Sequence, residues 1–111
     1  MEIGRVIKSI RIGYRIYQIK EWSEAELVTT ESFGQCDKQR GIIYVCAHLD
    51  PVVVADTLLH EILHAVWHEY GCQDDDREER IVHTLASGLI QVMRDNPSAI
   101  RYLLKLTKQE D

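Results

Sequence analysis

The stretch DTLLHEILHAVWHEYG, residues 56–71, holds three of the chain's five histidines at a spacing of four residues, with a glutamate directly after the first. This spacing predicts a helix, because its apolar side chains also recur every three or four residues. His60 and His64 lie one turn apart, so both imidazoles can face one ion. Glu61 is rotated by about 100° from His60 and therefore stands beside such an ion.

His60-Glu61-Ile62-Leu63-His64 is the His-Glu-x-x-His pattern that zinc hydrolases require on a helix. A zinc ion held by two histidines and a carboxylate keeps a fourth position for water and lowers the pKa of that water towards ~7. The pattern therefore predicts Glu61 as the general base. The alternative interpretation is a histidine-rich helix face that lies in water and binds no metal.

A third ligand has to come from outside this helix, and REERIVHTLASGLIQVMRD, residues 77–95, offers candidates. Glu79 lies at the edge of its predicted buried stripe, and Glu78 lies nearer the middle as a rival. The alternative for either glutamate is that it binds no metal and interacts only with the helix dipole. His83, one turn after Glu79, can hydrogen-bond a ligand, stabilise an oxyanion, replace Glu79 as third ligand, or have no role in the site. The stripe comprises Ile81, Val82, Leu85, Ala86 and Leu89.

Residues 1–50 read as strands instead. IRIGYRIYQI (10–19) alternates with period two and predicts one strand beginning near Ile3, 26–36 predicts a second, and IIYVCAHL (42–49) a third. Their short separations favour a short antiparallel sheet of about three strands.

Helix boundaries are marked by proline and glycine. Asp50-Pro51 begins the histidine helix and Gly71 ends it, while Asn96-Pro97 ends the second helix and opens a C-terminal one. Strands followed by helices indicate an α+β fold, and residues 1–111 are expected to form a single domain.

Composition excludes several classes of function. A net charge of -5 argues against nucleic-acid binding, and no apolar run approaches the ~18 residues that span a bilayer. The cysteines are odd in number and lack C-x-x-C spacing, which indicates free thiols in a reducing cytosol and a cytoplasmic protein. They are Cys36, Cys46 and Cys72.

The sequence TLLHEILHAVWH, followed by EERIVHTLASGL, resembles the ImmA/IrrE-like metallopeptidases, small zincins common in phages and prophages. The resemblance covers about residues 33–93. In that family the ligand glutamate is followed by apolar residues at offsets three, six and seven, which favours Glu79 over Glu78. The chain departs from the pattern at His83, where the family usually has asparagine.

The resemblance implies a small zincin-like domain with one zinc ion per chain, held by His60, His64 and Glu79. It implies a gluzincin-type peptidase in which Glu61 activates zinc-bound water. An extended protein or peptide substrate is expected to pair with residues 42–47 as an added strand. The alternative is a metal-binding regulatory module of phage or prophage origin without proteolysis, and a third hypothesis is an interaction protein without metal.

Overall fold

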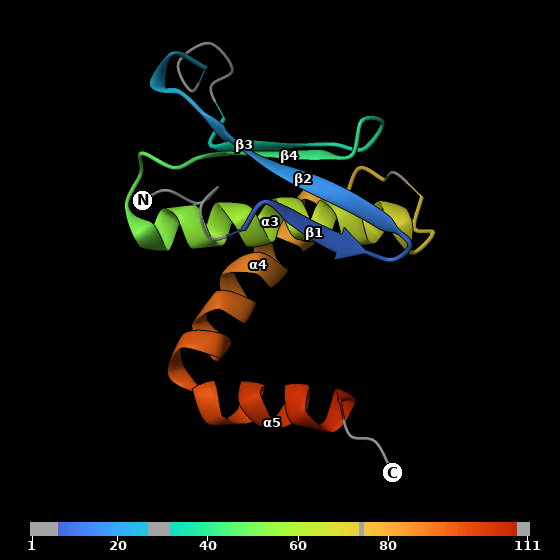
Figure 1. Ribbon diagram of the computed structural model, residues 1–111, viewed down its shortest axis with the longest axis vertical. Coiled ribbons are helices and arrows are strands. Elements are labelled where there is room, and N and C mark those ends of the chain that lie inside the picture. The colour runs from blue at the N-terminus through green and yellow to red at the C-terminus, as the bar shows by residue number, and fades with distance from the viewer. Residues whose placement is uncertain (1–6, 27–31, 74, 109–111) are drawn as a thin grey trace.

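The computed structural model describes residues 7–26, 32–73 and 75–108 (Figure 1). Within these residues four strands precede three long helices, which confirms the α+β class. No helix in the described part of the chain is both long and apolar enough to cross a membrane. In chain order the elements are β1 (Ser9–Ile12), β2 (Arg15–Trp22), β3 (Gly34–Asp37), β4 (Ile42–Cys46), α3 (Pro51–Glu69), α4 (Glu78–Asp95) and α5 (Pro97–Thr107).

The sheet is mixed, with the strand order β1-β2-β4-β3. β1 pairs with β2 and β3 with β4 in antiparallel fashion, whereas β2 and β4 run parallel. The prediction of about three strands in an antiparallel sheet was therefore wrong. Three of the five residues of β4 are buried and apolar, namely Ile43, Val45 and Cys46, and a strand of this kind takes an interior position in a sheet.

Residues 10–19 form a hairpin instead of the single strand that their alternation predicted. Gly13 has a φ of 63°, a left-handed conformation that glycine adopts at little cost. The chain reverses there, so Ile12 pairs with Arg15 and Tyr14 is fully exposed at the turn. The second predicted strand, 26–36, is observed only as β3. Its residues 27–31, like the predicted strand start near Ile3, lie outside the described residues.

α3 lies against one face of the sheet (Figure 1), and residues of both form the hydrophobic core. It begins at Pro51 after the N-cap Asp50, as predicted, and Gly71 follows its end with a φ of 85°. Burial of apolar area here stabilises the fold by about 25 cal/mol per Å². The buried core cluster is made of Ile12, Tyr17, Ile19, Ile43, Val45, Ala47, Val54 and Ala65.

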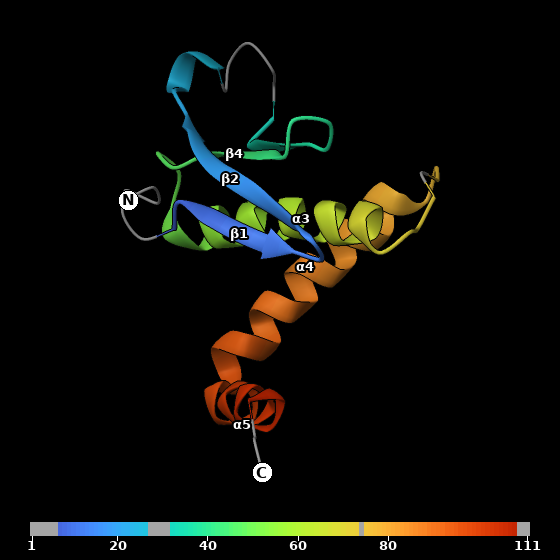
Figure 2. The same ribbon diagram turned by 45° about the vertical axis from the view of Figure 1, so that its right-hand side comes forward.

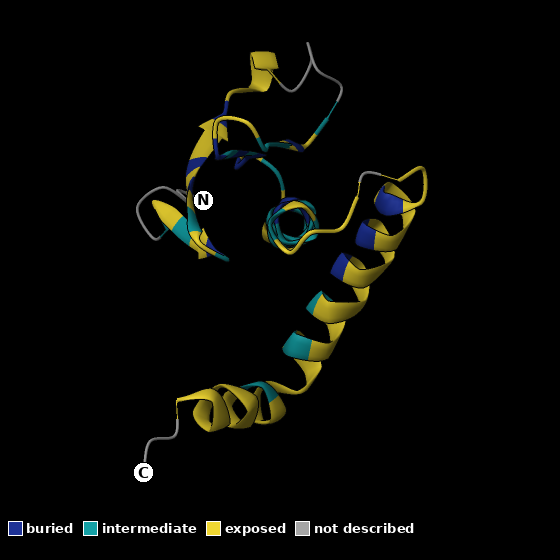
Figure 3. Ribbon diagram, turned by 90° about the vertical axis from the view of Figure 1, so that its right-hand side faces the viewer, coloured by how far each residue is buried: buried dark blue, intermediate teal, exposed yellow. Residues whose placement is uncertain are grey.

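α4 packs on α3 away from the sheet, so α3 is seen end-on between the sheet and α4 in Figure 3. Val82 and Ala86 are buried in this contact, as predicted. The other three residues of the predicted stripe, Ile81, Leu85 and Leu89, are 38–49% exposed, so that part of the prediction was wrong. α5 then projects away from the body of the molecule (Figures 1 and 2).

Candidate metal centre

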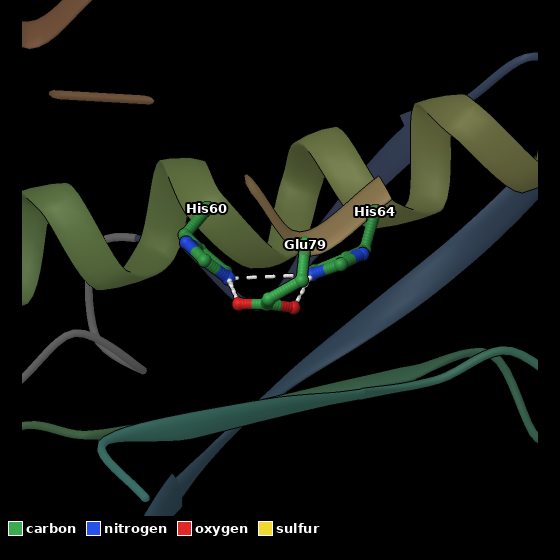
Figure 4. A group of neighbouring side chains, drawn as sticks. All are labelled: His60, His64 and Glu79. Carbon is green, nitrogen blue, oxygen red and sulfur yellow. Dashed lines mark hydrogen bonds and ion pairs between the residues drawn. The ribbon is translucent and has the colours of Figure 1, made fainter. Parts of the chain in front are cut away.

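His60 and His64 point from α3 towards the first turn of α4 (Figure 4). Their side chains are only 16% and 13% exposed, and their Nε2 atoms lie 3.2 Å apart. At His60 and His64, therefore, the histidine-rich face of the helix does not lie in open water. His68 is different, because its side chain is 46% exposed and its contact is with Glu69, 4.0 Å away.

Glu79 completes the group from α4. Its Oε1 lies 2.7 Å from Nε2 of His60, and its Oε2 lies 2.8 Å from Nε2 of His64. Figure 4 shows the carboxylate placed between the two imidazoles. The three predicted ligands thus come together, with donor atoms within 4.8 Å of one another, and this group can hold a metal ion.

The spacing of the donor atoms fits a small tetrahedral cation. Bonds of about 2.0–2.1 Å to zinc place two ligand atoms about 3.3 Å apart, close to the 3.2 Å between the histidine nitrogens. The carboxylate oxygens of Glu79 lie 2.7 and 2.8 Å from the histidine nitrogens, about half an ångström closer than that spacing. Because the Glu79 side chain is 70% exposed, it has room to move outwards by this amount.

Glu78, the rival third ligand, contacts the other side of the His64 ring. Its Oε2 lies 2.5 Å from Nδ1 of His64 and 3.3 Å from Nζ of Lys38. When Nδ1–H donates to this carboxylate, the Nε2 lone pair of His64 is directed at His60 and Glu79. This lone pair and the Glu79 carboxylate are then both acceptors, 2.8 Å apart, and they repel one another unless a proton or a metal ion lies between them.

Glu61, the predicted general base, is buried, at 7% exposure. It faces β3, where Gly34 has no side chain: a Cβ there would lie 3.4 Å from Cγ of Glu61 and 2.8 Å from Cγ2 of Thr57. Burial raises the pKa of Glu61 to about 7; the charge of Glu79 also raises it, and His64 lowers it.

Two clefts meet at this site. One, of about 650 Å³, extends between α3 and α4, and the other, of about 500 Å³, extends along β3 towards Lys38. His60, Glu61 and Glu79 line both. His83 lines the larger cleft, with its ring centroid 6.1 Å from that of His60. Among the described residues His83 is outside the group of donor atoms that can share one ion.

Two residues of the site, Gly34 and Lys38, were absent from the sequence prediction. A glycine inside a strand signals a close backbone approach, and that signal was available for Gly34. Nothing in the local sequence links Lys38 to Glu78, which is 40 residues away.

Comparison of the chain with family models, curated proteins and solved structures gives no match.

Proposed function

We propose that the chain is a zinc-dependent metallopeptidase, with His60, His64 and Glu79 as the metal ligands. The observation that carries this proposal is the convergence of two imidazoles and one carboxylate beside a buried second carboxylate, Glu61. A set of two nitrogens and one oxygen suits zinc and leaves a position open. When bound, zinc acts as a Lewis acid that polarises a carbonyl group and acidifies water.

Glu61 is the proposed general base. It accepts a proton from the water whose oxygen forms a bond to the peptide carbonyl carbon, and it passes that proton to the amine as the C–N bond breaks. A carboxyl group with a pKa near neutrality suits both transfers. His83, on the wall of the larger cleft, is the candidate to donate a hydrogen bond to the developing oxyanion.

An extended substrate is proposed to add to β3. The predicted pairing along residues 42–47 is wrong, because β4 is already paired on both sides, with β2 and β3. β3 has one partner among the described strands, and it borders the smaller cleft through Gly34, Gln35 and Cys36. Backbone pairing along its outer edge would align a peptide beside Glu61.

The test is cleavage by metal-loaded wild type and Glu61→Gln, with a library of peptides as substrate and mass spectrometry as the readout. Glu61→Gln should bind one zinc ion per chain as the wild type does and should cleave about 100-fold or more slowly. Glu24→Gln, at an exposed position away from the clefts, is the matched control and should cleave normally. Undiminished cleavage by zinc-loaded Glu61→Gln would contradict the proposed mechanism.

The second candidate function is a metal-binding regulatory module, of phage or prophage type, that cleaves nothing. It is favoured by the amount of apolar surface that α4 and α5 expose, because such surface is typical of proteins that bind a partner. This alternative also predicts one zinc ion per chain. It differs in predicting no cleavage products from the library with either wild type or Glu61→Gln.

A further inference from the structure

α4 presents three different faces around its circumference. Val82 and Ala86 face α3 and are 1% exposed. Glu79, His83 and Ser87 follow one another at four-residue intervals and line the larger cleft. The third face adjoins the α3 contact on the side away from the cleft, and a role for it as an interface does not depend on the proposed enzymatic function.

This outer face is apolar. Ile81, Leu85, Leu89 and Val92 are 38–49% exposed along it. Ile81, Leu85, Gly88 and Val92 are separated by four, three and four residues, the spacing with which helices pair in coiled coils. A Cβ at Gly88 would meet no atom of the described residues within 4 Å. Contacts among the described residues therefore do not explain why a glycine, which weakens a helix, stands here. A second helix packed closely against α4 would explain it, because close packing requires a residue without a side chain.

α5 continues the exposed surface. None of its 11 residues is buried, and in Figure 3 it is almost wholly in the colour of exposed residues. An isolated helix of this length is marginal in water, so α5 is expected to need a partner. Four of its large apolar side chains are 46–61% exposed, namely Tyr102, Leu103, Leu104 and Leu106.

The exposed area matches what a dimer needs. Eight large apolar side chains of α4 and α5 are exposed. At about 80 Å² each they offer on the order of 600 Å² per copy, and a polar rim brings this near the ~800 Å² that each partner contributes to a standard interface. Thr84 and Gln91 flank the outer face of α4 and carry no charge, so two copies would not repel one another there.

Charge also favours a second copy. Residues 97–108 carry Arg101, Lys105 and Lys108 and no acidic residue, which leaves 10 basic and 18 acidic residues in the rest of the chain. A basic helix on an acidic body is complementary to the acidic body of another copy. An anionic membrane would attract α5 but repel the rest of the molecule.

We infer that two copies of the chain associate, with two-fold symmetry, through the outer face of α4 and through α5, and bury these helices together. The larger cleft opens on a different face of α4 and stays accessible in such a dimer. The symmetry requires the same patch on both copies to be self-complementary. A substitution in this patch should therefore act twice at each interface.

Light scattering of the wild-type chain at sub-millimolar concentration should give twice the chain mass of 12.9 kDa. Leu85→Gln combined with Leu103→Gln should give the single-chain mass, with the circular dichroism spectrum and the zinc stoichiometry of the wild type. Arg80→Gln, exposed on α4 outside the outer face, is the matched control and should stay dimeric.

Gly88→Ala gives a second readout that does not depend on loss of folding. It should raise the dimer dissociation constant at least about tenfold, because a Cβ separates the paired helices, while raising the melting temperature of the Leu85→Gln/Leu103→Gln monomer. A wild-type chain of single-chain mass would overturn the inference, as would a double variant that stays dimeric. A wild-type monomer that sediments with vesicles of anionic phospholipid would overturn it in favour of a membrane surface.

Discussion

Replacing Glu78 with glutamine is expected to weaken zinc binding by about 10–100-fold, because this residue orients His64 without contacting the ion. Its Oε2 lies 2.5 Å from Nδ1 of His64 and 3.3 Å from Nζ of Lys38. Glutamine keeps the shape of the side chain but loses the charge that favours protonated Nδ1. Tenfold in affinity is about 1.4 kcal/mol, so the expected loss is about 1.4–2.8 kcal/mol.

The same substitution should also destabilise the metal-free protein. Breaking a fully buried ion pair costs about 3–5 kcal/mol, but the Lys38 side chain is 23% exposed and water offsets part of that cost. A loss of about 1–3 kcal/mol follows, seen as a lower melting temperature in the presence of a chelator. Adding Lys38→Gln should recover part of this stability, because it removes an ammonium group whose charge Glu78 no longer balances, and should leave the zinc affinity low.

Competition with a chromophoric chelator measures the affinity, and Glu79→Gln is the matched comparison. Loss of a direct ligand should cost more than about 100-fold, well above the loss at Glu78. A greater loss at Glu78 than at Glu79 would make Glu78 the ligand and refute the assignment. An unchanged affinity in Glu78→Gln would refute its role in orienting His64.

Three further substitutions or reactions test the fold around the site. Tyr17→Phe should cost about 1–2 kcal/mol of unfolding free energy in chemical denaturation, because the buried hydroxyl donates to Glu69 at 2.7 Å; no change would mean that water replaces this bond at no cost. Gly34→Ala should lower the melting temperature and the zinc affinity together, because its Cβ would lie 2.7 Å from a backbone oxygen of β4 and 2.8 Å from Cγ2 of Thr57 on α3. Normal values for both would contradict the close packing of β3 on α3. With a thiol reagent at pH 8, the exposed Cys72 should react first and Cys36 slowly. The reason is that burial raises the pKa of the Cys36 thiol to about 12. Equal reaction rates of the two cysteines would contradict the burial of Cys36.

The helices could be predicted from the sequence because local signals define their ends. Asp50-Pro51 and Asn96-Pro97 restrict the backbone before each helix, and Gly71 supplies the left-handed residue after α3. The two histidines of the motif share a helix, so their spacing alone predicted that they converge. The prediction that Glu79 lies beside these histidines required only that the next helix pack against α3.

The strand pairing of the sheet could not be predicted from the periodicity of the sequence. A two-residue turn at Gly13 and Tyr14 preserves the alternation of Ile10, Ile12 and Ile16, so one strand and a hairpin have the same pattern. Ile16 is 63% exposed on β2 while Ile12 is buried, which shows that the alternating residues do not share one buried face. The parallel pairing of β2 with β4 likewise joins segments about 20 residues apart, beyond the range of local signals.

The three side chains predicted as ligands lie together, whereas the groups around them were not predicted. Burial of Glu61 comes from the approach of β3 at Gly34, and the orientation of His64 comes from Glu78 and Lys38. These are contacts between distant segments, and they form only when the sheet and both helices are assembled. Sequence spacing therefore predicted the donor atoms but could not predict the groups that orient them.

X-ray absorption at the zinc edge of the purified, zinc-loaded chain tests the proposed metal centre most directly. The structure leads us to expect one zinc ion per chain with nitrogen and oxygen neighbours at about 2.0–2.1 Å and outer scattering from two imidazole rings. A metal content well below one per chain would contradict the proposal. So would a sulfur neighbour at about 2.3 Å, because that distance would replace a member of the His60, His64 and Glu79 group by a cysteine.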